Sequence, residues 1–157
     1  MITYLNVPSV FQEDDYSCGP ACINMLANYY KRCNKNGTEY SLSHIRKICN
    51  VDKITGTNYK DMNAALKHFG LKRVRCKNVN DIKKSLDNRY PVLTITPHTE
   101  EKNAAHYIII RGYKKELDGT SSLLIADPFH RHYKQDQKYL MKQLEKEDNW
   151  IWSIRPA

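Results

Sequence analysis

Two cysteines near the N-terminus raise the first question of chemistry. They lie four residues apart in the stretch VFQEDDYSCGPACINMLANYYKR, whose second half has the apolar spacing of a helix. Cys18 would lie just before that helix, with Gly19 and Pro20 in its first turn. A thiol there faces unpaired backbone N–H groups and the positive end of the helix dipole, and both favour the reactive thiolate. Cys18 is therefore the candidate nucleophile, small Gly19 would let a substrate backbone approach, and Cys22 is expected to be a packing thiol.

A nucleophilic thiol needs a base, and one of the six histidines is placed to act as one. His106 opens the apolar stretch HYIIIRG, which is typical of a strand, and a strand end on a rigid sheet can hold a base in position. His130 and His132 form an H-x-H pair that could bind a metal in isolation. Further ligands at a convincing spacing are not found, so neither a metal nor another cofactor is expected.

Two more residues could complete a site around Cys18 and His106. Asp127 ends the stretch LLIAD, and strand pairing through the turn DGTSS could bring it beside His106, where a carboxylate would fix the tautomer of the ring. An aspartate before Pro128 is also a common turn starter. Acyl transfer develops an oxyanion that needs donors, and the Gln12 amide with the Cys18 backbone N–H could supply them. Taken alone, Gln12 is more simply interpreted as a surface glutamine in a polar loop.

The pattern of the chain changes from helical to extended near its middle. Helices are expected from residue 19, at 41–49, at 57–70 and at 80–88, because apolar residues recur there at helical spacing. Strands are expected at 90–96, 106–116 and 121–128, where β-branched and aromatic residues gather, followed by a short helix at 137–147 and a last strand at 149–154. This segregation predicts an α+β fold, with N-terminal helices packed on a C-terminal antiparallel sheet.

Composition limits the function classes. A length of 157 residues predicts a single domain over residues 1–157. The net charge of +8 comes from scattered lysines without a long basic run, so no nucleic-acid partner is expected. There is neither a signal-peptide pattern nor an apolar stretch long enough to span a membrane, so we expect a cytoplasmic protein. The five cysteines are then expected to be reduced thiols.

Four motifs in order resemble one known family. They are Q-x5-C-G-x-A near the N-terminus, GTNYKDMNAALKHFGL in the middle, and then HYIIIRGY and LLIADP. Together they resemble the bacteriocin-processing cysteine peptidases, also called double-glycine leader peptidases, over most of the chain. That resemblance implies a papain-like cysteine peptidase fold. It also implies Cys18 as nucleophile, His106 as general base and then acid, Asp127 as its orienter and Gln12 in the oxyanion hole.

The resemblance implies a peptide or protein substrate that is cut after small residues such as Gly-Gly. The sequence departs from the family at Ser17, where an acidic residue is usual, and in the longer stretch NKNGTEYSL. No membrane domain follows the final IRPA, so a free-standing domain is expected, and a separate transporter partner stays open. Two other functions remain possible: a papain-like acyltransferase resembling phytochelatin synthases, which passes the acyl group to an amine, and a non-catalytic peptide-binding module.

Overall fold

The computed structural model describes residues 2–12, 14, 16–52, 56–97 and 105–157. The helices are α1 (Cys18–Tyr29), α2 (Leu42–Ile48), α3 (Tyr59–His68), α4 (Val79–Asp87) and α5 (Gln137–Glu145). The strands are β1 (Ile2–Tyr4), β2 (Leu71–Arg75), β3 (Val92–Pro97), β4 (Ala105–Lys115), β5 (Ser121–Asp127), β6 (Arg131–Asp136) and β7 (Ile151–Pro156).

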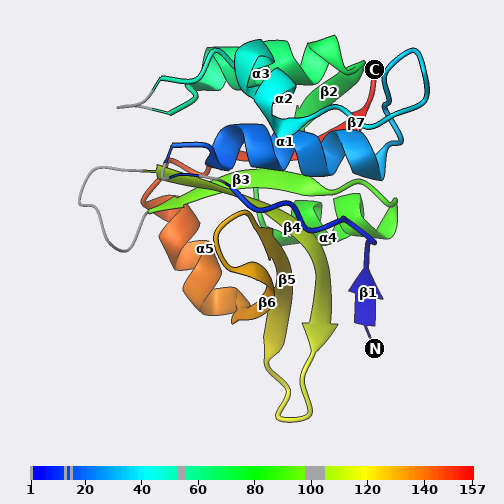
Figure 1. Cartoon of the computed structure of the whole chain (residues 1–157). Helices are drawn as coiled ribbons and strands as arrows, with labels where there is room; N and C mark the ends of the chain where they lie inside the picture. Colours follow the sequence, from blue (N-terminus) through cyan, green and yellow to red (C-terminus); the bar gives the residue numbers. More distant parts are fainter. Residues whose placement is uncertain (1, 13, 15, 53–55, 98–104) are drawn as a thin grey trace.

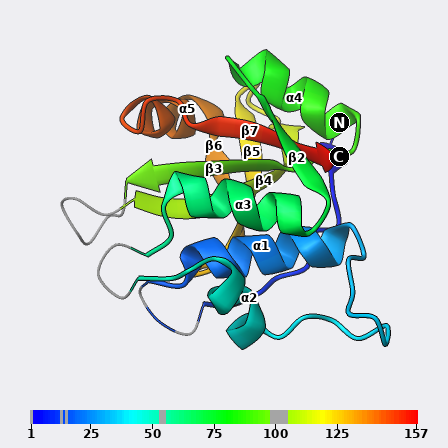
Figure 2. The same ribbon diagram turned by 90° about the horizontal axis from the view of Figure 1, so that it is seen from above.

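The strands form one antiparallel sheet with helices on both faces. The strand order is β2-β7-β3-β4-β5-β6, and β1 pairs with β4 outside this path. The helices α1, α2 and α3 lie on one side of the sheet, and α4 and α5 lie on the other (Figures 1 and 2). The expected α+β architecture is therefore confirmed, but helices do not all come first. The strand β1 precedes α1, and β2 lies between α3 and α4.

The hairpin of β4 and β5 brings two of the predicted site residues, His106 and Asp127, close together. Its turn follows the expected DGTSS stretch, where Gly119 has a φ of +87°, a conformation that favours glycine. The register pairs Ile109 with Ala126, so the start of β4 and the end of β5 lie at the same edge. His106 is the second residue of β4 and Asp127 the last residue of β5. His106 and Asp127 are 21 residues apart in the sequence, and the antiparallel pairing of β4 with β5 makes them neighbours.

The helix α1 is the buried helix of the fold. All its residues from Cys18 to Ala27 are buried, because it packs between the sheet and the helices α2 and α3. Gly19 has a packing role that the sequence did not predict. A Cβ atom at this position would come within 3.0 Å of both Met62 Sδ and Thr57 Cβ. The space beside Gly19 is therefore filled by the protein itself, not kept open for a substrate backbone.

Side-chain caps explain where the shorter helices begin. Ser41 accepts a hydrogen bond from the His44 backbone N–H at the start of α2, as its position in the sequence predicts. Asn58, Asn78 and Asp136 cap α3, α4 and α5 in the same way. Each cap satisfies a backbone N–H of the first turn that has no acceptor within its own helix.

Candidate active site

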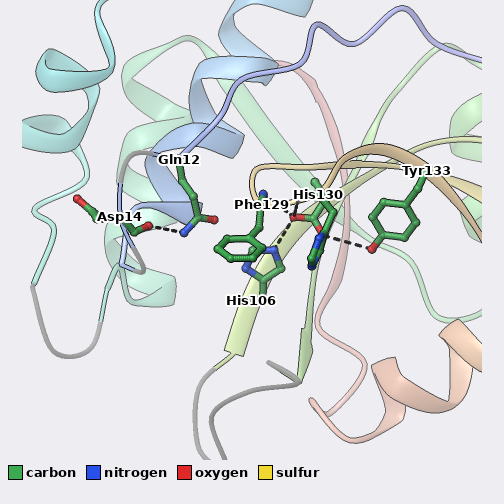
Figure 3. A network of polar contacts seen from close by, with 7 residues as sticks. Gln12, Asp14, His106, Phe129, His130 and Tyr133 are labelled. Carbon is green, nitrogen blue, oxygen red and sulfur yellow. Dashed lines mark hydrogen bonds and ion pairs between the residues drawn. The ribbon is translucent and has the colours of Figure 1, made fainter.

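A buried histidine–carboxylate pair lies at the edge of the sheet. His106 Nε2 lies 2.7 Å from Asp127 Oδ1, and the two residues are 7% and 2% exposed. Figure 3 shows the His106 ring joined to this carboxylate. Because Nε2 is engaged by Asp127, Nδ1 is the ring nitrogen that remains for a second partner.

The Asp127 carboxylate has three further donors. Its Oδ1 accepts hydrogen bonds from the backbone N–H groups of Phe129 at 2.7 Å and of His130 at 3.3 Å. Its Oδ2 accepts one from the Tyr133 hydroxyl at 3.2 Å. All these contacts appear together in Figure 3. The carboxylate is therefore both oriented and stabilised in its ionised form by the turn after β5 and by β6.

Cys18 is the first residue of α1 and lies beside this pair. It is 8% exposed, and it lies close enough to His106 for its thiol to raise the pKa of that ring through hydrogen bonding and charge. As the first residue of a helix, it has a backbone N–H that lacks an intrahelical acceptor. The thiol thus lies beside both a helix N-terminus and an imidazole ring.

His106 and Asp127 each stabilise the charged form of the other. Burial by itself lowers the pKa of His106, but the hydrogen bonds and charges of Asp127 and Cys18 outweigh burial and raise it to about 9. Burial raises the pKa of Asp127, but the bond and charge of His106 outweigh it, so the pKa of this carboxyl lies below its usual value. At neutral pH the site therefore holds a His106 imidazolium beside the Asp127 carboxylate.

Gln12, which precedes the N-terminus of α1, is held by two hydrogen bonds. Its backbone N–H donates to the Pro128 carbonyl at 3.0 Å, which ties the N-terminal segment to the turn after Asp127. Its side-chain Nε2 donates to the Asp14 carbonyl at 2.5 Å. The other amide atom, Oε1, is buried without a hydrogen-bond partner among the described residues. Nε2 carries two hydrogens, so one of them remains for an additional acceptor.

Asp14 organises the loop before Cys18, a role that the sequence analysis missed. Its carboxylate accepts hydrogen bonds from the Ser17 hydroxyl at 2.5 Å and the Tyr16 backbone N–H at 3.2 Å. It also forms an ion pair with Arg46 of α2, at 3.1 Å. The bond from the Tyr16 N–H to the Asp14 side chain makes an Asx-type turn. An aspartate in a polar stretch directly before a helix could have indicated this turn. Ser17, where the family usually has an acid, is thus paired with a carboxylate from three residues earlier.

The remaining cysteines do not share the surroundings of Cys18. Burial raises the pKa of Cys22 well above its ordinary value, as the expected packing role implies. Burial also raises the pKa of Cys49 to about 12 and that of Cys76 to about 11. Cys33 is exposed, and all five thiols are free. In the part of the chain that the structure describes, no three histidine, cysteine or acidic side chains are grouped to hold a metal ion.

The chain is similar in sequence to proteins of a known family. A sequence model described as the Peptidase C39 family matches residues 6–151. The lactococcin-G-processing and transport ATP-binding protein LagD of Lactococcus lactis is 26% identical over 119 residues, which are 76% of this chain and 15% of LagD. The chain therefore spans only a small part of that relative.

Two solved structures share the fold. One is a double glycine motif protease from an AMS/PCAT transporter in complex with the leader peptide, with a TM-score of 0.68, 18% identity, and coverage of 99% of this chain and 95% of that one. The other is the peptidase domain of Streptococcus ComA, a bifunctional ABC transporter of a quorum-sensing pathway, with a TM-score of 0.71, 21% identity, and coverage of 97% and 100%. These matches confirm the expected papain-like fold. Among the described residues of this chain, no helix is long and apolar enough to cross a membrane.

The surroundings of the five thiols predict different alkylation rates. With iodoacetamide near pH 7, we expect Cys18 to react about tenfold faster than exposed Cys33, because an ordinary thiol is only a few per cent thiolate at that pH. The three buried thiols should react slowest. Site-resolved mass spectrometry measures all five rates in one sample, with Cys33 as the internal control. Equal rates for Cys18 and Cys33 would contradict an activated thiol.

Replacing the carboxylate with an amide should isolate its charge. In Asp127→Asn the side-chain oxygen can still accept from His106 and from the turn, so ring orientation is kept while the charge is lost. We expect the pKa of His106 to fall from about 9 toward or below its ordinary value, as followed by the ring-proton NMR signal. Tyr133→Phe, the control, removes one hydrogen bond from the same carboxylate without removing its charge, and should leave the pKa of His106 raised.

The same pair predicts how stability depends on pH. A histidine whose pKa is about 9 in the folded chain and about 6.5 in the unfolded chain stabilises the fold fully below pH 6.5 and loses this contribution as pH rises through 9. The contribution is on the order of 3 kcal/mol. Urea unfolding from pH 6 to 9.5 should show the loss in the wild type and a much smaller one in Asp127→Asn. Parallel curves for the two proteins would argue against the pair.

Proposed function

The chain belongs to the Peptidase C39 family and is a cysteine peptidase, and we propose that Cys18, His106, Asp127 and Gln12 carry its reaction. The observation that supports these roles best is the contact of His106 with both partners: Asp127 on Nε2, at 2.7 Å, and the Cys18 thiol. A nucleophile, a base and an orienting group within hydrogen-bond reach are the arrangement that thiol acyl transfer needs.

The first half of the reaction forms a covalent intermediate. The Cys18 thiolate attacks the carbonyl carbon of the cleaved bond, and the carbonyl electrons move to oxygen. The second N–H of Gln12 Nε2 and the Cys18 backbone N–H donate to this oxyanion. The intermediate then collapses, the C–N bond breaks, and the His106 imidazolium gives its proton to the leaving amine. A thioester on Cys18 and a free amine remain.

Water completes the cycle. Neutral His106 takes a proton from a water molecule, whose oxygen attacks the thioester carbon. The C–S bond breaks, a carboxylic acid leaves, and the thiolate–imidazolium pair is restored. Asp127 stays ionised throughout and holds the ring so that its Nδ1 faces first the sulfur and then the leaving amine.

We propose a peptide cut after a pair of glycines as the substrate. This proposal is supported by the four motifs in the sequence and by the solved relative whose description names a double glycine motif and a leader peptide. The acyl part of the substrate would lie beside Cys18 and Gln12, and because Cys18 is buried at the packed start of α1, glycine residues would approach its sulfur with the least obstruction.

Cleavage of a peptide with an internal Gly-Gly pair tests the function. The wild type should release a fragment that ends in a Gly-Gly carboxylate, identified by mass spectrometry. Cys18→Ala and His106→Ala should lower the rate by more than about a thousandfold while circular dichroism shows a folded chain. Cys33→Ala removes an exposed thiol and should cleave at the wild-type rate. Cleavage by Cys18→Ala would rule out the covalent route.

A separate variant tests the oxyanion donor. Gln12→Ala should lower kcat by about a hundredfold to a thousandfold and leave KM nearly unchanged, because the lost bond forms only in the transition state. Asn6→Ala removes an exposed amide from the same N-terminal segment and serves as the control. A change in KM alone would assign Gln12 to ground-state binding.

A further inference from the structure

A cavity of about 260 Å³ lies beside the histidine–carboxylate pair on the α5 side of the sheet. His106 and Asp127 form part of its wall, Phe129 and Tyr133 continue it, and Leu140 of α5 closes its apolar side. At about 30 Å³ per water molecule, the cavity would hold roughly nine waters. It is therefore large enough for a whole amino-acid side chain.

The cavity lies on the leaving-group side of the reaction. Its lining includes His106 but neither Cys18 nor Gln12, so it is separated from the groups that hold the acyl part and the oxyanion. The leaving amine must come within hydrogen-bond distance of His106 to receive its proton. The residue that carries this amine would therefore lie next to the cavity, whereas the acyl part would lie beside Cys18 and Gln12, which do not line it.

The lining has the chemistry of an uncharged, amphipathic side-chain site. Gln135 of β6 and Gln143 of α5 contribute amides, and Tyr139 contributes a half-exposed phenol. The described lining residues include neither lysine nor arginine, and the two charged groups among them, the His106 imidazolium and the Asp127 carboxylate, are already bonded to each other. A charged side chain would lose water there without gaining a partner of opposite charge. An apolar body with or without an amide tip would be favoured.

We propose that this cavity receives the side chain of the residue that follows the cleaved bond, and that it selects a medium-sized uncharged side chain such as leucine or glutamine. This inference rests on the proposed peptidase reaction and adds a preference on the leaving-group side. It concerns a different part of the substrate from the glycine pair.

A peptide series tests the preference directly. The peptides share one sequence with a Gly-Gly pair and differ only in the next residue, which is Leu, Gln, Gly, Asp or Lys. We expect kcat/KM for the Leu and Gln peptides to exceed that for the Asp and Lys peptides by at least about tenfold. The Gly peptide, which has no side chain to place in the cavity, should fall between them.

Two substitutions in the lining should change the preference for the residue after the cleaved bond, one by filling the cavity and the other by adding a charge to it. Gln143→Trp fills the cavity from α5 and should lower kcat/KM for the Leu and Gln peptides about tenfold relative to the Gly peptide. Lys142→Trp places the same bulk at an exposed neighbouring position of α5 and is the matched control. Gln135→Lys brings a cation into the cavity and should raise kcat/KM for the Asp peptide about tenfold relative to the Leu peptide.

The outcomes separate this inference from the proposed function. Equal cleavage of all five peptides, unchanged in relative rate by Gln143→Trp and Gln135→Lys, would overturn the inference and leave the peptidase reaction standing. An equal loss for every peptide in Gln143→Trp, with no gain for the Asp peptide in Gln135→Lys, would also overturn it. Failure of the wild type to cleave any peptide would overturn the proposed function and this inference together.

Discussion

The site depends on one buried carboxylate that cannot be left without partners. Asp127 is 2% exposed, and an unpaired ionised carboxylate at that depth would cost on the order of several kcal/mol. Two backbone N–H groups of the turn after β5 and the Tyr133 hydroxyl meet part of this need, and His106 meets the rest. Because local turn geometry already fixes the carboxylate, His106 binds to a target whose direction is set, and its ring is oriented in turn.

The same turn also joins the two layers of the fold. Pro128, directly after the carboxylate, accepts the backbone N–H of Gln12, so the segment before α1 is attached to the sheet next to His106. From the opposite side, Arg46 of α2 holds Asp14, whose carbonyl accepts from the Gln12 amide. The Gln12 side chain is therefore positioned from two directions, by the sheet through Pro128 and by α2 through Asp14.

The features that the sequence predicted well are those that local chemistry determines. The β4–β5 hairpin follows from its turn residues and apolar strands, and the start of α2 follows from Ser41. Strand β6 was missed because RHYKQD is polar and only one face is partly covered, and β2 was missed because its partner β7 lies about 80 residues away. Asp14 was missed because its contacts depend on a loop that no periodicity describes, and Tyr133 was missed together with β6, the strand that carries it.

Gly19 shows how packing between layers sets the position of the thiol. Its small size lets the start of α1 contact Thr57 and Met62, and added atoms would meet them at 3.0 Å. Relief of that overlap would need a shift of the Thr57 or Met62 side chain or of the backbone next to Cys18, whereas His106 is held on the sheet by Asp127. A displacement of about 1 Å between reacting groups can cost about a hundredfold in rate. The small size of Gly19 therefore lets α1 approach Thr57 and Met62 closely, and this contact helps to place Cys18 relative to His106.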